Sequence, residues 1–169
     1  MRPQGGGPLS RARSYTFLVA IAAVVVVADR ITKIVVERRF GVGYGPRQIV
    51  DHILFLEVTR NAGAAFGIFQ NLTLGFLLIS AVVMVGILIY YWRLPKGDWT
   101  ARLGLSLVFG GALSNAYDRA VKGSVIDFIK VPHWPIFNVA DSAVTVGVAL
   151  LLIGTLWASR QPHRVSSNG

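Results

Sequence analysis

The sequence has 169 residues and contains no cysteine. Without a thiol, the chain cannot form a disulfide, bind a metal through thiolates, use a cysteine nucleophile or carry a lipid on a cysteine of its own. Histidine is scarce: His52, His133 and His163 are scattered, and no H-E-x-x-H motif occurs, which argues against a zinc peptidase. The sequence also lacks the G-x-S-x-G motif of serine hydrolases. A serine–lysine pair stays open, because only the fold can show whether a serine lies near Lys33.

Charged residues are also few, at 15% of the chain, whereas hydrophobic residues make up 53%. The hydrophobic residues fall in blocks of about 20, the length that crosses a bilayer as a helix. Four such blocks predict transmembrane helices at about 15–36, 72–92, 101–121 and 138–157. Gly110 and Gly111 lie inside the third block, where they indicate close helix packing rather than a phosphate-binding loop. The predicted fold class is therefore an all-α membrane protein with four transmembrane helices.

The segments between these blocks complete the predicted layout. Residues 37–71 form a long loop in which Ile53 to Thr59 alternates in the manner of a strand, so we expect a small β element on the membrane surface. Residues 122–137 form a second loop. We expect a disordered tail at 1–13, one four-span domain at 14–158 and a polar tail at 159–169.

Positive charge dominates, with a formal net charge of +9. The basic residues lie mostly in tails and loops, so contact with lipid phosphates explains them better than nucleic acid does. Arg11 and Arg13 precede the first apolar block as in a signal peptide, but no small-residue cleavage site follows, and we expect an uncleaved helix. The basic tail and the short basic turn at 93–100 place both termini in the cytoplasm.

In this topology all acidic residues except Asp98 lie on the outer side. Ionisable groups within a bilayer cost about 2.5–3.5 kcal/mol each on insertion scales, so they usually pair or serve function. Polar residues gather at the outer helix ends and in the two outer loops, namely Asp29, Lys33, Asn61, Asn115, Asp118, Arg119, Asp127, Asn138 and Asp141.

Each of these residues also has a purely structural interpretation. Asp29 and Lys33 have the i,i+4 spacing of a helical ion pair. Asn138 and Asp141 have the spacing of a helix capping box. Asp118 and Arg119 suit an interfacial helix end, and Asp127 and Asn61 suit a solvated loop and a turn.

Taken together, the residues favour chemistry over structure alone. Asp127 and Asp141 are outer carboxylates without an obvious local cation. Two close carboxylates share one proton, because both cannot ionise cheaply. In aspartyl proteolysis the ionised member takes a proton from water and the protonated member polarises the scissile carbonyl. Because a helix N-terminus favours an anion, we expect Asp141 to be the ionised member.

Two other classes of protein stay open on these residues. A proton-coupled transporter also uses membrane carboxylates, but its relay acids should lie near the middle of the bilayer, where the second, third and fourth spans have none. A non-catalytic membrane scaffold would tolerate replacement of Asp127 and Asp141 by asparagine.

Four segments, in order along the chain, resemble lipoprotein signal peptidase, the type II signal peptidase family of bacteria. The segments are Asp29-Arg-Ile-Thr-Lys33, Arg60-Asn-Ala-Gly-Ala-Ala-Phe66, Gly110-Gly-Ala-Leu-Ser-Asn115-Ala-Tyr-Asp118-Arg119 continuing to Val125-Ile-Asp127-Phe128, and Phe137-Asn138-Val-Ala-Asp141-Ser142. Each segment alone is weak, but together they are highly specific.

The resemblance implies a role for each matching residue. Asp127 and Asp141 match the catalytic aspartates of the family. Other positions of this chain match polar or small residues that line or support the site in the family, namely Asn61, Gly63, Asn115, Asp118, Arg119 and Asn138. Asp29 and Lys33 match a pair that is structural in the family. One position departs from the family, which usually has glycine where this chain has Ser114. That hydroxymethyl group would narrow helix packing or add a hydrogen bond.

The resemblance also implies the activity. The substrates would be prolipoproteins that already carry diacylglyceryl on a cysteine, and the enzyme would cut just before that cysteine. We expect a monomer in the bacterial cytoplasmic membrane, with its active site at the extracytoplasmic face, contacts to membrane lipids, and no nucleic acid, metal or organic cofactor. Phe66 and Phe69 would supply apolar contact to the substrate.

Overall fold

The computed structural model describes residues 8–62, 73–95 and 97–159. The described helices are α1 (Pro8–Phe40), α2 (Thr73–Arg93), α3 (Trp99–Lys122) and α4 (Val139–Ser159). The strands are β1 (Arg47–Val50), β2 (Leu54–Asn61) and β3 (Val125–Lys130).

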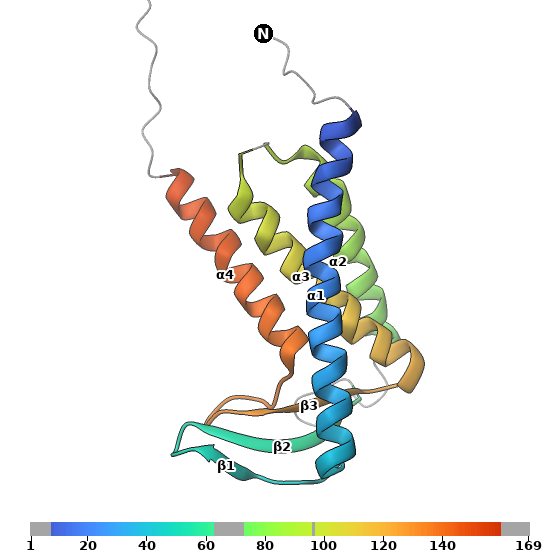
Figure 1. The fold of residues 1–169 in the computed structure, drawn as a ribbon, viewed down its shortest axis with the longest axis vertical. Helices are drawn as coiled ribbons and strands as arrows, with labels where there is room; N and C mark the ends of the chain where they lie inside the picture. Colours follow the sequence, from blue (N-terminus) through green and yellow to red (C-terminus); the bar gives the residue numbers. More distant parts are fainter. Residues whose placement is uncertain (1–7, 63–72, 96, 160–169) are drawn as a thin grey trace, which may run out of the picture.

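The helix α3 is the centre of the bundle, because it packs against α1, α2 and α4. Figure 1 shows the start of α1 and the end of α4 at the same end of the molecule, with the sheet across the opposite end. We call these the terminal end and the sheet end. Asp98 caps the start of α3 by accepting a 3.0 Å hydrogen bond from the backbone N–H of Ala101. Gly123 ends the helix with a φ of 70°, a left-handed conformation that favours glycine.

Small residues let α3 lie close to its neighbours. A Cβ atom on Gly104 would lie 2.8 Å from the carbonyl oxygen of Gly147 in α4. On the opposite face, a Cβ atom on Gly110 would lie 2.9 Å from the Cα atom of Ala22 in α1. Because both distances are shorter than a van der Waals contact, glycine at these positions is what allows the helices to approach.

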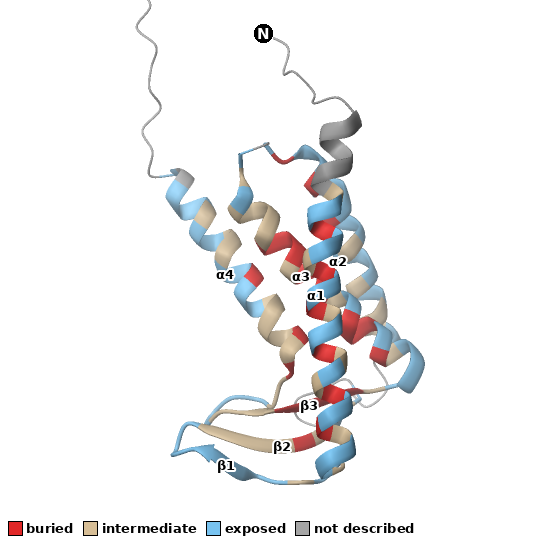
Figure 2. Cartoon of the chain, viewed as in Figure 1, coloured by how far each residue is buried: buried red, intermediate tan, exposed pale blue. Residues whose placement is uncertain are grey.

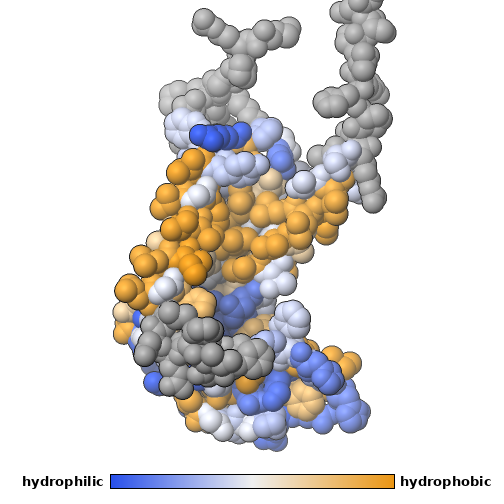
Figure 3. All heavy atoms as spheres, turned by 180° about the vertical axis from the view of Figure 1, so that it is seen from behind, coloured by the Kyte–Doolittle hydropathy of each residue, from blue (hydrophilic) through white to orange (hydrophobic). Residues whose placement is uncertain are grey.

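The outer surface of the bundle is apolar. Large hydrophobic side chains point outward from α2 and α4, including Leu74, Val82, Leu152 and Trp157, each at least 60% exposed. Figure 3 shows, on one face of the molecule, a band of hydrophobic side chains between two more polar ends. Thr73–Arg93 and Val139–Trp157 are long and apolar enough to cross a membrane. Water would not favour this much exposed apolar area on a small monomer, whereas lipid does.

The sheet is antiparallel, with strand order β1-β2-β3. Within it, Thr59 of β2 lies opposite Asp127 of β3. The sheet is fixed to the bundle by an apolar cluster in which Val36 of α1 packs with Val58, Ile126 and Phe128. Figure 2 shows buried stretches of β2 and β3 close to the end of α1. The strand that carries Asp127 is therefore held against the helices.

The predicted helices agree with the observed ones to within about two residues, except for the first. Helix α1 runs from Pro8 to Phe40 and so includes residues 8–13, which the sequence analysis assigned to a disordered tail. That assignment overlooked proline as a good first residue of a helix and the helix-forming leucine, arginine and alanine that follow the glycine run. Residues 1–7 and 160–169 lie outside the described residues.

The predicted β element is confirmed and proves to be larger. The strand expected at 53–59 is β2, but β1 was not predicted, and β3 lies in a segment that we assigned to a loop. The prolines at 132 and 135 favoured a loop, yet they come after the strand has ended. Val125-Ile126 and Phe128-Ile129, β-branched and aromatic residues around Asp127, were a strand signal that the analysis did not use.

Candidate active site

Asp127 lies on β3 with only 2% of its surface exposed. Its carboxylate accepts hydrogen bonds from two side-chain amides: Asn138 Nδ2 lies 2.6 Å from Oδ1, and Asn61 Nδ2 lies 2.9 Å from Oδ2. Asn61 ends β2, beside β3, so the pairing of the two strands brings it next to Asp127. The amides hold the carboxylate in a fixed orientation without neutralising its charge.

Asp141 lies in the first turn of α4, where Asn138 caps the helix. The backbone N–H of Asp141 donates to Asn138 Oδ1 at 2.9 Å, and Asp141 Oδ2 accepts from the backbone N–H of Asn138 at 3.2 Å. This is the reciprocal capping box expected from the spacing. The cap uses the backbone N–H and Oδ1 of Asn138, so its Nδ2 group can also donate a hydrogen bond to Asp127. Asn138 therefore joins the two carboxylates directly.

Asn115 of α3 makes a second link between the same groups. Its Nδ2 donates to Asp141 Oδ1 at 2.7 Å, and its Oδ1 accepts from Asn138 Nδ2 at 3.2 Å and from Lys33 Nζ at 3.0 Å. The side-chain amide thus connects Asp141 with a cation on α1.

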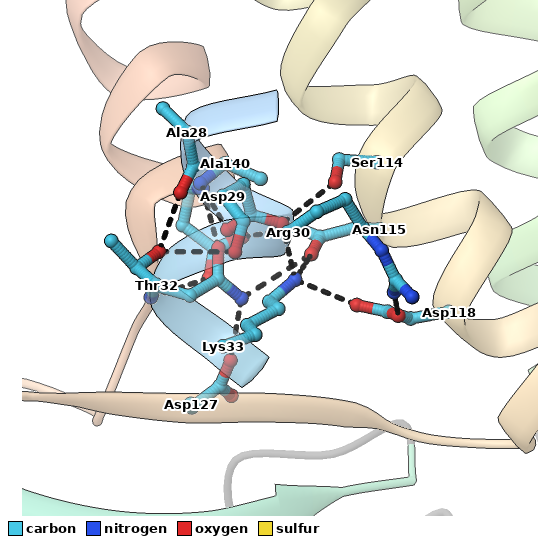
Figure 4. A network of polar contacts seen from close by, with 12 residues as sticks. Ala28, Asp29, Arg30, Thr32, Lys33, Ser114, Asn115, Asp118, Asp127 and Ala140 are labelled. Atoms are coloured by element: carbon cyan, nitrogen blue, oxygen red, sulfur yellow. Dashed lines mark hydrogen bonds and ion pairs between the residues drawn. The ribbon is translucent and has the colours of Figure 1, made fainter. Parts of the chain in front are cut away.

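Behind the amides lies a buried ion cluster. Lys33 Nζ lies 2.6 Å from Asp29 Oδ2 and 2.8 Å from Asp118 Oδ2, and Arg30 forms an ion pair with Asp118. Figure 4 shows Lys33 between these carboxylates, with Asp127 on the adjacent strand. The cations Lys33 and Arg30 balance the anions Asp29 and Asp118, so the cluster is neutral. Asp127 and Asp141 are not part of this cluster. An ammonium held by two carboxylates has no free lone pair, which argues against Lys33 as the base of a serine–lysine pair.

Asp29 also reaches α4. Its Oδ1 accepts a 3.0 Å hydrogen bond from the backbone N–H of Ala140, and its carboxylate is fully buried. A carboxylate at a helix N-terminus satisfies a backbone donor that has no partner within the helix and interacts favourably with the helix dipole. The ion pair of Asp29 with Lys33 therefore also anchors the start of the helix that carries Asp141.

Arg119 extends from the outer end of α3. Its guanidinium carbon lies 5.0 Å from the ring centre of Phe76, and it is close enough to Asp141 and Asp127 to attract both. Its buried Nε atom has no hydrogen-bond partner among the described residues. This leaves a donor beside the carboxylate pair.

The surroundings of Asp127 change its acidity. Burial, and to a smaller extent the nearby charge of Asp141, together raise the pKa of Asp127 to about 6, although the hydrogen bonds from Asn61 and Asn138 act to lower it. A carboxyl group with this pKa can hold a proton near neutral pH and release it, as a general acid must.

The structure brings together the polar residues predicted from the sequence, with contributions from α1, β2, α3, β3 and α4. Gly63, Phe66 and Phe69 lie outside the described residues. Among the contacts that were not predicted is the ion pair of Arg30 with Asp118. A hydrogen bond from Ser114 was one of two expectations, and its acceptor proves to be Asp29. Arg30 is close to Lys33 in the sequence of the same helix, which indicates that Arg30 lies near the site. No local sequence pattern indicated Asp118 as its partner. Within the described residues, no group of three or more histidine, aspartate or glutamate side chains is placed to hold a metal ion.

The fold and the site define a helical membrane protein with a pair of aspartates, joined by Asn138, at the sheet end of the bundle. Similarity to known proteins narrows this class. The family model described as signal peptidase (SPase) II matches residues 21–157. The chain is 46% identical over 135 residues to the lipoprotein signal peptidase of Brevibacillus brevis, covering 79% of this chain and 90% of that protein. It is 40% identical over 140 residues to that of Bacillus subtilis, covering 80% and 90%.

Solved structures agree with the sequence relatives. A bacterial membrane enzyme determined at 2.3 Å resolution superposes with a TM-score of 0.79 at 30% identity, covering 87% of this chain and 92% of that one. A second, at 1.9 Å, gives a TM-score of 0.75 at 32% identity, covering 82% and 92%. The chain therefore belongs to the signal peptidase II family, the aspartic lipoprotein signal peptidases of the bacterial membrane. This membership decides against the transporter and the scaffold considered from the sequence.

Proposed function

We propose that this enzyme removes signal peptides from diacylglyceryl-modified prolipoproteins, with Asp127 and Asp141 as its catalytic pair. The observation that carries the proposal is the bridge through Asn138, whose side-chain amide donates to Asp127 while its backbone N–H donates to Asp141. One residue thereby fixes the relative position of two carboxylates, the buried Asp127 and the partly buried Asp141, that have no cation in hydrogen-bond contact among the described residues. Aspartyl proteolysis needs such a pair.

The two carboxyl groups take different parts in the reaction. Asp141, at a helix N-terminus, is the ionised base that takes a proton from the attacking water. Asp127, whose pKa is raised to about 6 by burial, gives its proton to the oxygen of the scissile carbonyl. Collapse of the resulting diol breaks the C–N bond as Asp141 returns its proton to the leaving nitrogen and Asp127 regains its own. The two groups thus end as they began.

The site lies at a depth suited to a lipidated peptide. Asp141 lies in the first turn of α4 and Asp127 lies on β3, so the pair is at the sheet end of the bundle. Figure 3 shows the apolar band of the bundle giving way to more polar residues toward that end. A diacylglyceryl chain would lie along the apolar outer surface and place the bond before the modified cysteine at this boundary. We propose that α1 and α3 cross the membrane together with α2 and α4. Both termini then face the cytoplasm, the sheet is extracytoplasmic, and residues 14–158 work as one monomeric domain.

Arg119 and the amides would orient the substrate. The unpartnered Nε donor of Arg119 is available to a peptide carbonyl beside the pair. Asn61, Asn115, Asp118 and Asn138 hold the pair and its supports, and we propose that Gly63 allows close approach of the substrate backbone. The chemistry assigned to these groups needs no metal or organic cofactor.

The test is cleavage by the purified full chain of one prolipoprotein peptide prepared with and without diacylglyceryl on its cysteine. Asp127→Asn and Asp141→Asn should each lower kcat by about a thousandfold, the scale of general acid–base catalysis, while thermal unfolding in detergent shows that they remain folded. Asp51→Asn is the matched control, because Asp51 lies in the turn between β1 and β2 with 82% of its side chain exposed. Equal cleavage of the two peptides would refute the lipid requirement, and cleavage by either folded site variant at the wild-type rate would remove that aspartate from the mechanism.

A further inference from the structure

Ser114 differs from most helical serines and threonines in what its hydroxyl binds. The hydroxyls of several serines and threonines donate to a carbonyl of their own helix three or four residues earlier, namely Thr32, Ser106, Ser142, Thr145, Thr155 and Ser159. Serine and threonine hydroxyls within helices commonly form such a bond. Ser114 on α3 instead donates to Asp29 Oδ2 on α1 at 2.7 Å, and it is fully buried. Figure 4 shows this contact between the two helices.

The Asp29 carboxylate that receives this bond is shared by three helices. Its Oδ2 contacts both Ser114 of α3 and Lys33 of its own helix, the latter at 2.6 Å, and its Oδ1 accepts from the backbone N–H of Ala140 at the start of α4. Because one planar group serves all of these donors, its orientation is set by them together. Loss of one donor leaves the carboxylate less constrained, and the first affected contact outside the ion cluster is the N-terminus of α4.

Ala140 directly precedes Asp141, so the orientation of Asp29 is transmitted to the proposed base over a single residue. We propose that Ser114 is a positioning residue, whose hydroxyl fixes Asp29 against the first turn of α4 and thereby sets the place of Asp141 in the catalytic pair. This inference rests on the proposed function. Here the hydroxyl adds a donor to the carboxylate.

The first test compares Ser114→Ala with Ser114→Gly in the full chain. Alanine removes the donor and keeps the space closed, so kcat should fall by about tenfold, the scale of a lost hydrogen bond to a charged group. KM should not change, because the hydroxyl contacts the carboxylate rather than the substrate. Glycine opens enough room for a water molecule to donate to Asp29 in place of the hydroxyl, so its kcat should lie between those of alanine and wild type.

This order separates positioning from stability. Glycine is a weaker helix former than alanine, so a merely structural role would rank Ser114→Gly below Ser114→Ala in both thermal stability and activity. The positioning role predicts opposite orders, with alanine more stable and glycine more active. Alanine equal to wild type in kcat, or glycine below alanine, would overturn the inference.

A matched control and a second pair keep the test decisive. Ser106 is also fully buried on α3, but its hydroxyl donates to the carbonyl of Arg102 in the same helix at 2.6 Å, so Ser106→Ala should leave kcat unchanged. Ser114→Thr keeps the donor and Ser114→Val has the same shape without it, so threonine should cleave faster even if alanine fails to fold. A tenfold loss in Ser106→Ala or equal rates for threonine and valine would contradict the inference. If wild type does not cleave the lipidated peptide, the proposed function falls and this inference with it, whereas cleavage by wild type with no hydroxyl dependence overturns only the role of Ser114.

Discussion

The two ends of the helix bundle are stabilised by different chemistry. At the terminal end, α1, α2 and α3 meet in an apolar cluster that includes Leu18, Ile87, Tyr91 and Leu105. At the sheet end, the buried contacts between helices include ion pairs and amide hydrogen bonds. Apolar packing tolerates substitutions of similar size, whereas a buried polar network loses much when one partner is removed. The comparison predicts that removing one polar partner at the sheet end destabilises the protein more than a similar-sized substitution at the terminal end does.

The largest expected effect on stability comes from the centre of the ion cluster. Lys33→Met keeps the length of the side chain but leaves Asp29 and Asp118 without their shared cation, which should lower the free energy of unfolding by about 3–5 kcal/mol. Lys130→Met is the control, because Lys130 pairs with Glu57 on the sheet with 35% of its side chain exposed and should contribute less than about 1 kcal/mol. Denaturation in detergent measures the free energy of unfolding of both variants. Similar losses in the two would contradict the expectation that the buried ion pair contributes more than the partly exposed one.

The next effect depends on pH. Burial raises the pKa of Asp127 from 3.8 to about 6 in the folded protein, so the folded state binds the proton more tightly than the unfolded state. The stability that this gives is complete below about pH 4 and is lost as the pH rises through 6, amounting to about 3 kcal/mol. Asp127→Asn cannot titrate, so wild type should lose stability relative to this variant between about pH 4 and 7. Parallel stability profiles for the two proteins would contradict a buried, proton-binding Asp127.

The same proton should be visible in catalysis. If protonated Asp127 is the general acid, kcat/KM for cleavage falls as the pH rises above about 6, because the free enzyme then loses the proton that it must donate. A rate that rises steadily between about pH 6 and 8 would assign the proton to another group.

The smallest expected change in stability tests the two ends within one pair of helices. Gly111 at the sheet end faces the carbonyl oxygen of Ala140, and Gly104 toward the terminal end faces that of Gly147, so alanine at either position forces α3 and α4 apart. Each substitution should destabilise the fold by about 1–3 kcal/mol. Only Gly111→Ala displaces the start of α4 beside Asp141, so it alone should also lower kcat. Loss of activity in Gly104→Ala, measured on folded protein, would mean that helix spacing matters along the whole of α4.

Much of the fold could be predicted because it follows from local patterns. The apolar blocks fixed α2, α3 and α4 closely, and alternation identified β2. β3 was missed because the two prolines near it suggested a loop, although its β-branched residues indicated a strand. The helical start at Pro8 was missed because the glycine run before it was extended too far into a tail. In both cases the analysis placed the boundary of a loop or tail at the wrong residue.

The residues of the site could be predicted from the sequence, but most of the contacts between them could not. The i,i+4 spacing of Asp29 and Lys33 and the capping spacing of Asn138 and Asp141 predicted contacts that the structure contains. By contrast, the bond from Asp29 to the backbone of Ala140 joins residues 111 positions apart, and no local rule reaches that far. Likewise, nothing in the sequence showed that Asn138 would cap a helix and hold Asp127 at once, because that depends on how β3 docks beside α4.

The most direct test of the account measures kcat for Asp127→Asn, Asp141→Asn and the variant that carries both changes. Groups that act as one catalytic unit are strongly non-additive, since removing either one already abolishes the shared step. We predict that the double variant, folded by the criterion of thermal unfolding, cleaves the lipidated peptide no more slowly than the slower single variant. Losses that multiply in the double variant would contradict the account, because they would show two aspartates acting independently rather than as a pair.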